Sequence, residues 1–225
     1  MKITTCIFDA YGTLFDVSAA ARDAAAEPEN AELADIWPQI AEDWRTKQLQ
    51  YSWLRAVARK HVDFWQLTTD ALDWALEAAN IKNDALRERL LALYWELSAY
   101  PEVAEVLQTL KSRGIATGIL SNGNPEMLNA AVSSANISSL LDAVMSVEEV
   151  GVYKPHDLVY EMVESRFICE RDDVLFVSAN GWDAAGAASY GYKTAWINRR
   201  AEPVDKLYGT PDFVLSDLKP ILDLI

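Results

Sequence analysis

Two different spacings of hydrophobic residues divide the chain. Residues 3–8 form a short run of β-branched and other apolar residues that ends at Asp9. Such a run, closed by an acid, is typical of a strand buried in a parallel sheet. Between residues 17 and 97 the apolar positions instead recur every three or four residues, which predicts helices. The expected helices cover residues 37–60, 64–78 and 86–97, after a weakly specified Ala-rich stretch at 18–30.

From Pro101 onward, segments with a helical spacing alternate with short apolar runs. Repeated strand and helix units predict a parallel sheet with helices on both faces, the doubly wound α/β class. The sequence therefore predicts an α/β core domain from residues 1–16 and 98–225, and an inserted helical domain at 17–97. The expected strands are 115–120, 144–146, 174–178, 194–197 and 213–215, and the expected helices are 102–112, 125–135, 158–166, an Ala-rich helix from about Asp183, and 220–224.

Composition narrows the choice of partners. The 225 residues are 51% hydrophobic and carry a formal net charge of −14. Binding to nucleic acid or to an anionic membrane surface needs a basic surface, so neither partner is expected. A small substrate that enters a local positive site is expected instead.

The two cysteines, Cys6 and Cys169, do not suggest a disulfide framework. Cys6 falls within the first expected strand, so a buried reduced thiol is expected, which suits a reducing cytoplasm. The N-terminal apolar run is too short for a signal peptide, and no apolar stretch is long enough to span a bilayer.

Four loops with polar or charged residues each follow an expected strand. They are residues 9–13, 121–124, 154–155 and 178–183. In a doubly wound sheet the carboxyl ends of the strands lie at one edge, where ligands bind, so the four loops are expected to converge there. An isolated acid such as Asp9 often only caps a turn. Convergence of the four loops favours the other interpretation, a nucleophilic carboxylate.

The loop sequences DAYGTLFD, LSNG, VYKP and VSANGWDA resemble, in order, the four motifs of the haloacid-dehalogenase superfamily, which also contains many phosphatases. The helical insertion resembles the cap domain of that superfamily. The resemblance covers essentially the whole chain and implies a Rossmann-like core with a helical cap.

Two positions separate dehalogenases from phosphatases within this resemblance. Tyr11 stands where phosphatases have a second acid, which protonates the leaving oxygen and whose backbone carbonyl helps to hold magnesium. A halide needs no proton to leave, so a dehalogenase tolerates this loss. The fourth motif has one acid, Asp183, where a metal site has two, and magnesium prefers several oxygen ligands. No metal and no cofactor are expected.

The stretch WRTKQLQYSWLR at residues 44–55 is similar to the cap helix of the L-2-haloacid dehalogenases. In that family an arginine of this helix contacts the departing halide and the substrate, and Arg45 takes its place here. A guanidinium group presents a permanent charge through several donors, which suits a small anion. An isolated arginine would more often be a solvated side chain.

The resemblance also assigns roles to the other site residues. Asp9 is the nucleophile, Thr13 and Ser178 hold it and nearby groups, Lys154 offsets negative charge, and Asn180 and Asp183 place the hydrolytic water. Ser121 and Asn122 hold the substrate carboxylate. Core packing is an equal alternative for Tyr160, as it is for Leu49, Phe64 and Trp182 around the halide. The expected catalytic set is Asp9, Thr13, Arg45, Lys154, Ser178, Asn180 and Asp183; the expected substrate-binding set is Tyr11, Arg45, Leu49, Phe64, Ser121, Asn122, Tyr160 and Trp182.

Neither histidine suggests a catalytic dyad. His61 lies at the end of the expected helix 37–60, and His156, after Lys154 and Pro155, is expected at the entry to a helix.

The expected reaction is hydrolysis of L-2-haloalkanoic acids to D-2-hydroxy acids and halide, with inversion, through an ester on Asp9. Two alternatives stay open: a magnesium-dependent phosphohydrolase of the same superfamily, and a non-catalytic protein that binds a small anion. Members of the family are often homodimers, so a homodimer is expected. The sequence leaves open the halogen and chain-length preference and the residue that activates water.

Overall fold

A six-stranded parallel sheet forms the centre of the computed structural model, which describes residues 3–225. The strand order is β3-β2-β1-β4-β5-β6, so the first strand lies between the second and the fourth. All five neighbouring pairs are parallel, which confirms the doubly wound α/β prediction. The strands are β1 (Thr5–Phe8), β2 (Ala116–Ser121), β3 (Ala143–Ser146), β4 (Val174–Ser178), β5 (Lys193–Ile197) and β6 (Phe213–Leu215).

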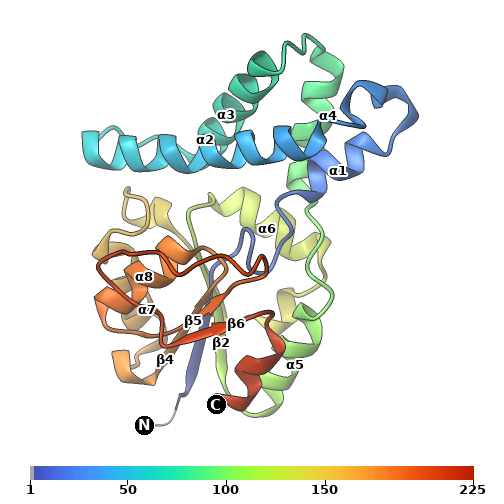
Figure 1. Ribbon diagram of the computed structural model, residues 1–225. Coiled ribbons are helices and arrows are strands. Elements are labelled where there is room, and N and C mark those ends of the chain that lie inside the picture. Colours follow the sequence, from blue (N-terminus) through green and yellow to red (C-terminus); the bar gives the residue numbers. More distant parts are fainter. Residues whose placement is uncertain (1–2) are drawn as a thin grey trace.

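Helices cover both faces of the sheet, with α5 and α6 on one side and α7 and α8 on the other (Figure 1). The chain moves outward from β1 in both directions, and right-handed crossovers then place the connecting helices on opposite faces. Every residue of β1 and of β4 is buried, as expected for strands covered on both faces. The helices are α5 (Val103–Ser112), α6 (Pro125–Ser134), α7 (Asp157–Phe167) and α8 (Gly181–Tyr190).

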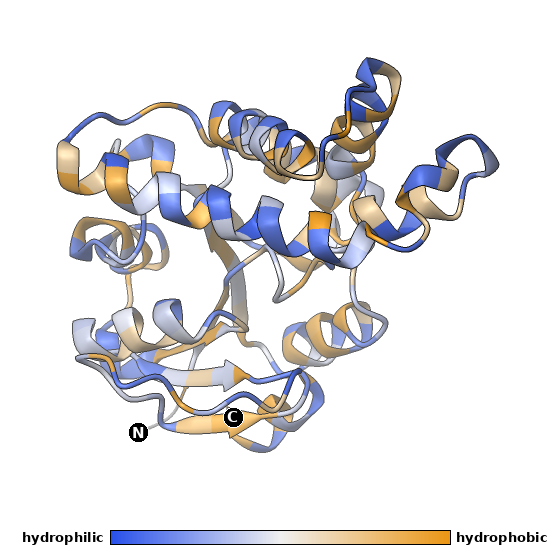
Figure 2. Cartoon of the chain, turned by 45° about the horizontal axis from the view of Figure 1, so that its top comes forward, coloured by the Kyte–Doolittle hydropathy of each residue, from blue (hydrophilic) through white to orange (hydrophobic). Residues whose placement is uncertain are grey.

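A second layer of helices lies above the carboxyl edge of the sheet, and α2 runs across it (Figure 1). Apolar residues of α2, α3 and α4 pack into the hydrophobic core, among them Trp44, Leu67 and Leu90. In Figure 2, hydrophilic and hydrophobic residues are mixed along α2, whose buried side chains include the polar Gln48 and Ser52 as well as Ile40 and Trp44. The elements are α1 (Ala19–Ala25), the 3₁₀ helix η1 (Pro28–Leu33), α2 (Trp37–Ala58), α3 (Phe64–Ala78) and α4 (Asp84–Trp95).

Most differences from the sequence predictions lie at the ends of elements. The first strand begins at Thr5 rather than Ile3. The C-terminal helix expected at 220–224 is a 3₁₀ helix, η5 (Lys219–Asp223), which is too short for several α-helical hydrogen bonds. Residues 3–225 contain three more short 3₁₀ helices: η2 (Ser138–Leu140), η3 (Val147–Glu149) and η4 (Arg171–Asp173).

Among the helices of residues 3–225, none combines the length and the apolar character needed to cross a membrane.

Candidate active site

Asp9 lies directly after β1 and is almost fully buried. Its Oδ2 accepts hydrogen bonds from Thr13 Oγ1 (3.0 Å) and Asn180 Nδ2 (2.8 Å), and its Oδ1 accepts one from Lys154 Nζ (3.2 Å). The donors come from three of the four loops expected at the sheet edge. Three hydrogen bonds hold the carboxylate in one orientation, as a nucleophile requires.

Lys154 bridges two buried carboxylates. Its Nζ lies 3.2 Å from Asp9 Oδ1 and 2.8 Å from Asp183 Oδ2, and the side chain is only 1% exposed. Tyr160 donates from its hydroxyl to Asp183 Oδ1 at 2.8 Å. Burial raises the pKa of Asp183 above its ordinary value, and the ammonium of Lys154 opposes that shift. The buried ammonium of Lys154 therefore offsets the charge of both carboxylates, Asp9 and Asp183, and these residues are called the cluster below.

Two hydroxyl groups shape the loop after β4. Thr13 Oγ1 accepts from the backbone N–H of Ala179 (2.7 Å) while it donates to Asp9. Ser178 Oγ accepts from the backbone N–H of Asn180 (3.1 Å). Thr13 thus contacts the carboxylate directly, whereas Ser178 acts on it through the position of Asn180.

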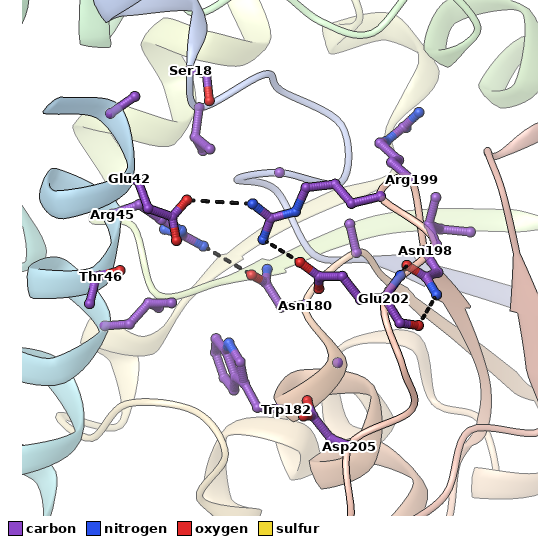
Figure 3. Close-up of a pocket in the computed structure, with 18 of the residues that line it drawn as sticks. Ser18, Glu42, Arg45, Thr46, Asn180, Trp182, Asn198, Arg199, Glu202 and Asp205 are labelled. Carbon is purple, nitrogen blue, oxygen red and sulfur yellow. Dashed lines mark hydrogen bonds and ion pairs between the residues drawn. The ribbon is translucent and has the colours of Figure 1, made fainter. Parts of the chain in front are cut away.

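Arg45 reaches from α2 to the edge of the sheet. Its Nη2 donates to Asn180 Oδ1 (3.3 Å) and to the carbonyl oxygen of Tyr11 (3.4 Å), and Figure 3 shows the Arg45 and Asn180 side chains pointing toward one another. Both hydrogen bonds are long and link Arg45 to neutral oxygens. The guanidinium charge is therefore not neutralised by them and is suited to an anion.

Ser121 and Asn122 build the loop after β2. Ser121 Oγ accepts from the backbone N–H of Gly123 (3.1 Å), and Asn122 Oδ1 accepts from the backbone N–H of Lys154 (3.0 Å). The second bond ties this loop to the lysine loop. Lys154 is thus fixed at its backbone by one loop and at its ammonium by two others.

Aromatic rings cover the other side of the site. The Tyr11 ring lies 6.4 Å from Phe64 and 5.8 Å from Tyr94, measured between ring centroids. Burial raises the pKa of the Tyr11 hydroxyl well above its ordinary value, so the phenol keeps its proton. Tyr94 was not among the residues expected from the sequence. Its spacing of four from Leu90 on the apolar face of its helix is the signal that could have found it.

Gly123 lies in close contact with Tyr11. A Cβ atom at residue 123 would come within 2.7 Å of Tyr11 Cε2. Gly123→Ala is expected to displace that ring and to lower the free energy of unfolding by about 1–3 kcal/mol, because overpacking a tight contact forces side chains from their rotamers. Near-ultraviolet circular dichroism and urea unfolding would measure both effects.

Gly114→Ala is a suitable control. Its Cβ would meet no atom within 4 Å, but its φ of +73° makes the substitution strained. The control should lower stability without changing the near-ultraviolet spectrum. An unchanged spectrum for Gly123→Ala would contradict the predicted contact.

A cavity of about 290 Å³ adjoins the site between α2 and the loops after β4 and β5. Arg45, Leu49, Asn180 and Trp182 line it, and several of its polar side chains are seen in Figure 3. Asp9 does not line the cavity, whereas Asn180, which donates a hydrogen bond to Asp9, and Arg45 do. Lys154, Phe64, Ser121, Asn122 and Tyr160 also lie outside its lining.

Comparisons with known proteins agree on one family. The family model of haloacid dehalogenase-like hydrolases matches residues 3–191. The (S)-2-haloacid dehalogenase 1 of Pseudomonas sp. (strain CBS-3) is 41% identical over 224 residues, which cover 99% of this chain and 96% of that protein.

Solved structures give the same result. The crystal structure of a dehalogenase with an intermediate complex superposes with a TM-score of 0.92, at 38% identity over 100% of this chain and 97% of the other. The L-2-haloacid dehalogenase from Xanthobacter autotrophicus, with chloropropionic acid covalently bound, gives a TM-score of 0.86 at 34% identity, over 99% and 98% of the two chains.

Proposed function

The chain belongs to the haloacid dehalogenase-like hydrolases, and we propose that it hydrolyses L-2-haloalkanoic acids to D-2-hydroxy acids and halide, as an (S)-2-haloacid dehalogenase. One observation of the site carries the proposal. The ammonium of Lys154 lies between the carboxylates of Asp9 and Asp183, while Arg45 reaches the same site from α2. This arrangement balances a carboxylate nucleophile against an anionic substrate.

In the first step, a carboxylate oxygen of Asp9 attacks C2 of the substrate from the side opposite the halogen. The new C2–oxygen bond forms as the carbon–halogen bond breaks, and the halide leaves with the bonding electrons. The configuration at C2 is inverted, and the substrate becomes an ester of Asp9. Covalent catalysis of this kind avoids direct displacement of halide by neutral water.

In the second step, water attacks the carbonyl carbon of the Asp9 ester, so the new hydroxyl oxygen of the product comes from Asp9. We propose Asp183 as the base, because Lys154 links its carboxylate to that of Asp9 and burial raises its pKa above that of an ordinary aspartate. Asn180 Nδ2 donates a hydrogen bond to Asp9 Oδ2 and helps to orient the ester. Breakdown of the tetrahedral intermediate cleaves the bond between the Asp9 carbonyl carbon and the ester oxygen, and that oxygen takes the proton held by Asp183 to become the hydroxyl group of the product. The second proton of the water passes to solvent, which restores the Asp9 carboxylate.

Positive charge makes the approach of two anions possible. Lys154 offsets the charge of Asp9, and Arg45 supplies donors for the substrate and the departing halide. Leu49 and Trp182 line the adjoining cavity, and we propose that they offer the departing halide an apolar wall. We propose that residues 121–122 bind the substrate carboxylate through the backbone N–H groups of their loop, and that Phe64 contacts the substrate near Tyr11.

The alternative of a magnesium-dependent phosphohydrolase fits these residues poorly. Tyr11 replaces the second acid of the first motif, and the fourth motif has one acid, Asp183, where a metal site has two. No three His, Cys, Asp or Glu side chains are grouped to hold a metal ion anywhere in residues 3–225. The other alternative, a non-catalytic binder of small anions, does not explain the buried carboxylate of Asp9, because a carboxylate that faces a bound anion repels it.

We propose that residues 17–97 act as a cap over a core of residues 1–16 and 98–225. The chain leaves the core after residue 16 and returns to it at residue 98. These two points lie side by side, because the backbone N–H of Asp16 donates to the carbonyl oxygen of Ser98 at 2.9 Å. A homodimer is proposed from the resemblance, and a reducing cytoplasm from the two unpaired cysteines, Cys6 and Cys169.

The test of function is chloride release from L- and D-2-chloropropionate in the presence of a chelator. Release from the L isomer, with D-lactate as the product, is expected. Cleavage of phosphate esters that depends on magnesium, without any chloride release, would replace the proposal with the phosphohydrolase alternative. No turnover of either class would favour the anion binder.

A further inference from the structure

The loop between α2 and α3 makes a set of contacts to the core that the reaction does not use. Three consecutive residues, His61, Val62 and Asp63, each bond to a different segment of the core. We propose that this set, called the clasp here, fixes the start of α3 over the active site. His61 and Asp63 are then positioning residues, and this role rests on the proposed dehalogenase function.

The first contact of the clasp joins His61 to η3. His61 Nε2 lies 2.9 Å from Glu148 Oε2, and each side chain is about one quarter exposed. The imidazole also packs against the Tyr153 ring, with 4.7 Å between centroids. The Tyr153 hydroxyl donates to the carbonyl oxygen of Val62, which makes the second contact. Tyr153 directly precedes Lys154, so the clasp also contacts the loop that carries Lys154.

The third contact joins two helix caps. Asp63 Oδ1 caps α3 by accepting from the backbone N–H groups of Trp65 (2.6 Å) and Gln66 (3.3 Å). Its Oδ2 accepts from Asn124 Nδ2 at 2.7 Å. Asn124 in turn caps α6, because its Oδ1 accepts from the backbone N–H of Met127 at 2.8 Å. Each side chain caps its own helix with one oxygen and uses its other terminal atom for the bond between the helices.

The clasp has a direct consequence for Phe64. This residue follows Asp63, is only 1% exposed, and places its ring 6.4 Å from Tyr11 and 5.9 Å from Tyr153. Asn124 is the last residue of the loop 121–124, which also holds Ser121 and Asn122. The clasp therefore links the Phe64 wall of the site to both the carboxylate-binding loop and the lysine loop. Supports of this kind hold a site in its productive geometry.

The reciprocal caps permit a test in which the two side chains exchange identities. Asp63→Asn keeps an oxygen for the α3 cap but turns an amide toward the amide of Asn124, so that two donors face one another. Asn124→Asp keeps the α6 cap but sets two carboxylates face to face. The double variant restores one donor and one acceptor, keeps both caps, and leaves the net charge unchanged.

Each single variant is expected to raise the KM for L-2-chloropropionate by about tenfold, with a smaller change in kcat, since one charge-assisted hydrogen bond is lost and a repulsive pair replaces it. The double variant should return to within about twofold of the parent KM. Asp70→Asn is the matched control: Asp70 accepts from Gln66 on the exposed side of α3, and the variant makes the same change of charge on the same helix. It should leave KM unchanged.

Amide hydrogen exchange tests the clasp without reference to any substrate. Exchange in the first turn of α3 should quicken in both single variants and recover in the double variant. Unchanged exchange in the single variants, or no recovery in the double variant, would overturn the clasp. Altered exchange with an unchanged KM would overturn the positioning role. Absence of chloride release from the parent protein would overturn the proposed function, and exchange would still decide on the clasp.

Discussion

Asp9→Asn is expected to abolish chloride release from L-2-chloropropionate, with a loss of at least about 10³-fold in kcat. The amide has no anionic oxygen to form the ester. Asp183, the other buried acid of the site, is not expected to replace Asp9, because its two oxygens are bonded to Lys154 and Tyr160. A single turnover of the parent protein in ¹⁸O-labelled water would test the Asp9 ester directly, because water attacks its carbonyl carbon and the label should therefore enter Asp9 before it enters the product.

The control experiment for Asp9→Asn must show that the variant still folds. The amide will turn its NH₂ group toward one of the donors that now face the carboxylate, Lys154, Thr13 or Asn180, so a loss of about 1–3 kcal/mol in the free energy of unfolding is expected. Circular dichroism and urea unfolding would measure it. Substantial chloride release by a folded Asp9→Asn variant, or label that enters lactate without entering Asp9 in the parent, would show that water attacks C2 directly.

Lys154→Met is expected to remove activity and to lower the free energy of unfolding by about 3–5 kcal/mol at neutral pH. Methionine fills a similar volume, so the effect isolates the charge. The substitution leaves Asp9 and Asp183 buried near one another, without the ammonium that now lies 3.2 Å and 2.8 Å from them. Urea unfolding would measure the loss.

The stability of Lys154→Met should also depend on pH, with a sign that burial sets. Burial already raises the pKa of Asp183, and loss of Lys154 removes the main opposing influence. A carboxyl group with a raised pKa in the folded state binds more protons there than in the unfolded chain, so stability falls as pH rises from the unfolded value near 3.8 through the folded value. The variant should be closest to the parent protein near pH 4 and most destabilised above neutrality.

Lys154→Met combined with Asp183→Asn is the matched comparison. Removing the second charge should recover part of the stability at neutral pH and weaken the pH dependence, because one buried carboxylate remains where there were two. A Lys154→Met variant that is equally destabilised at every pH would show that packing of the lysine stem, rather than its charge, stabilises the cluster.

The fold followed from local signals in the sequence. Alternation of short apolar runs with helical spacing predicted the parallel sheet, because strands covered on both faces must be continuously apolar. The entry of α7 at His156 was readable from a single residue, since capping is a contact within the first turn. The short 3₁₀ helix at the C-terminus was less readable, because five residues give little periodicity.

The composition of the site was suggested by the four loop motifs and by residues 44–55, whereas its connections depend on the tertiary structure. Sequence order cannot show that Lys154 bridges Asp9 and Asp183, since these residues come from three loops.

The bond between Asp63 and Asn124 joins residues 61 positions apart and required coordinates. Local pattern determined which elements form and which side chains stand at their ends. Only the packing of the helical layer on the sheet decided which of those ends meet, because the contacts form between residues whose spacing in the chain carries no period.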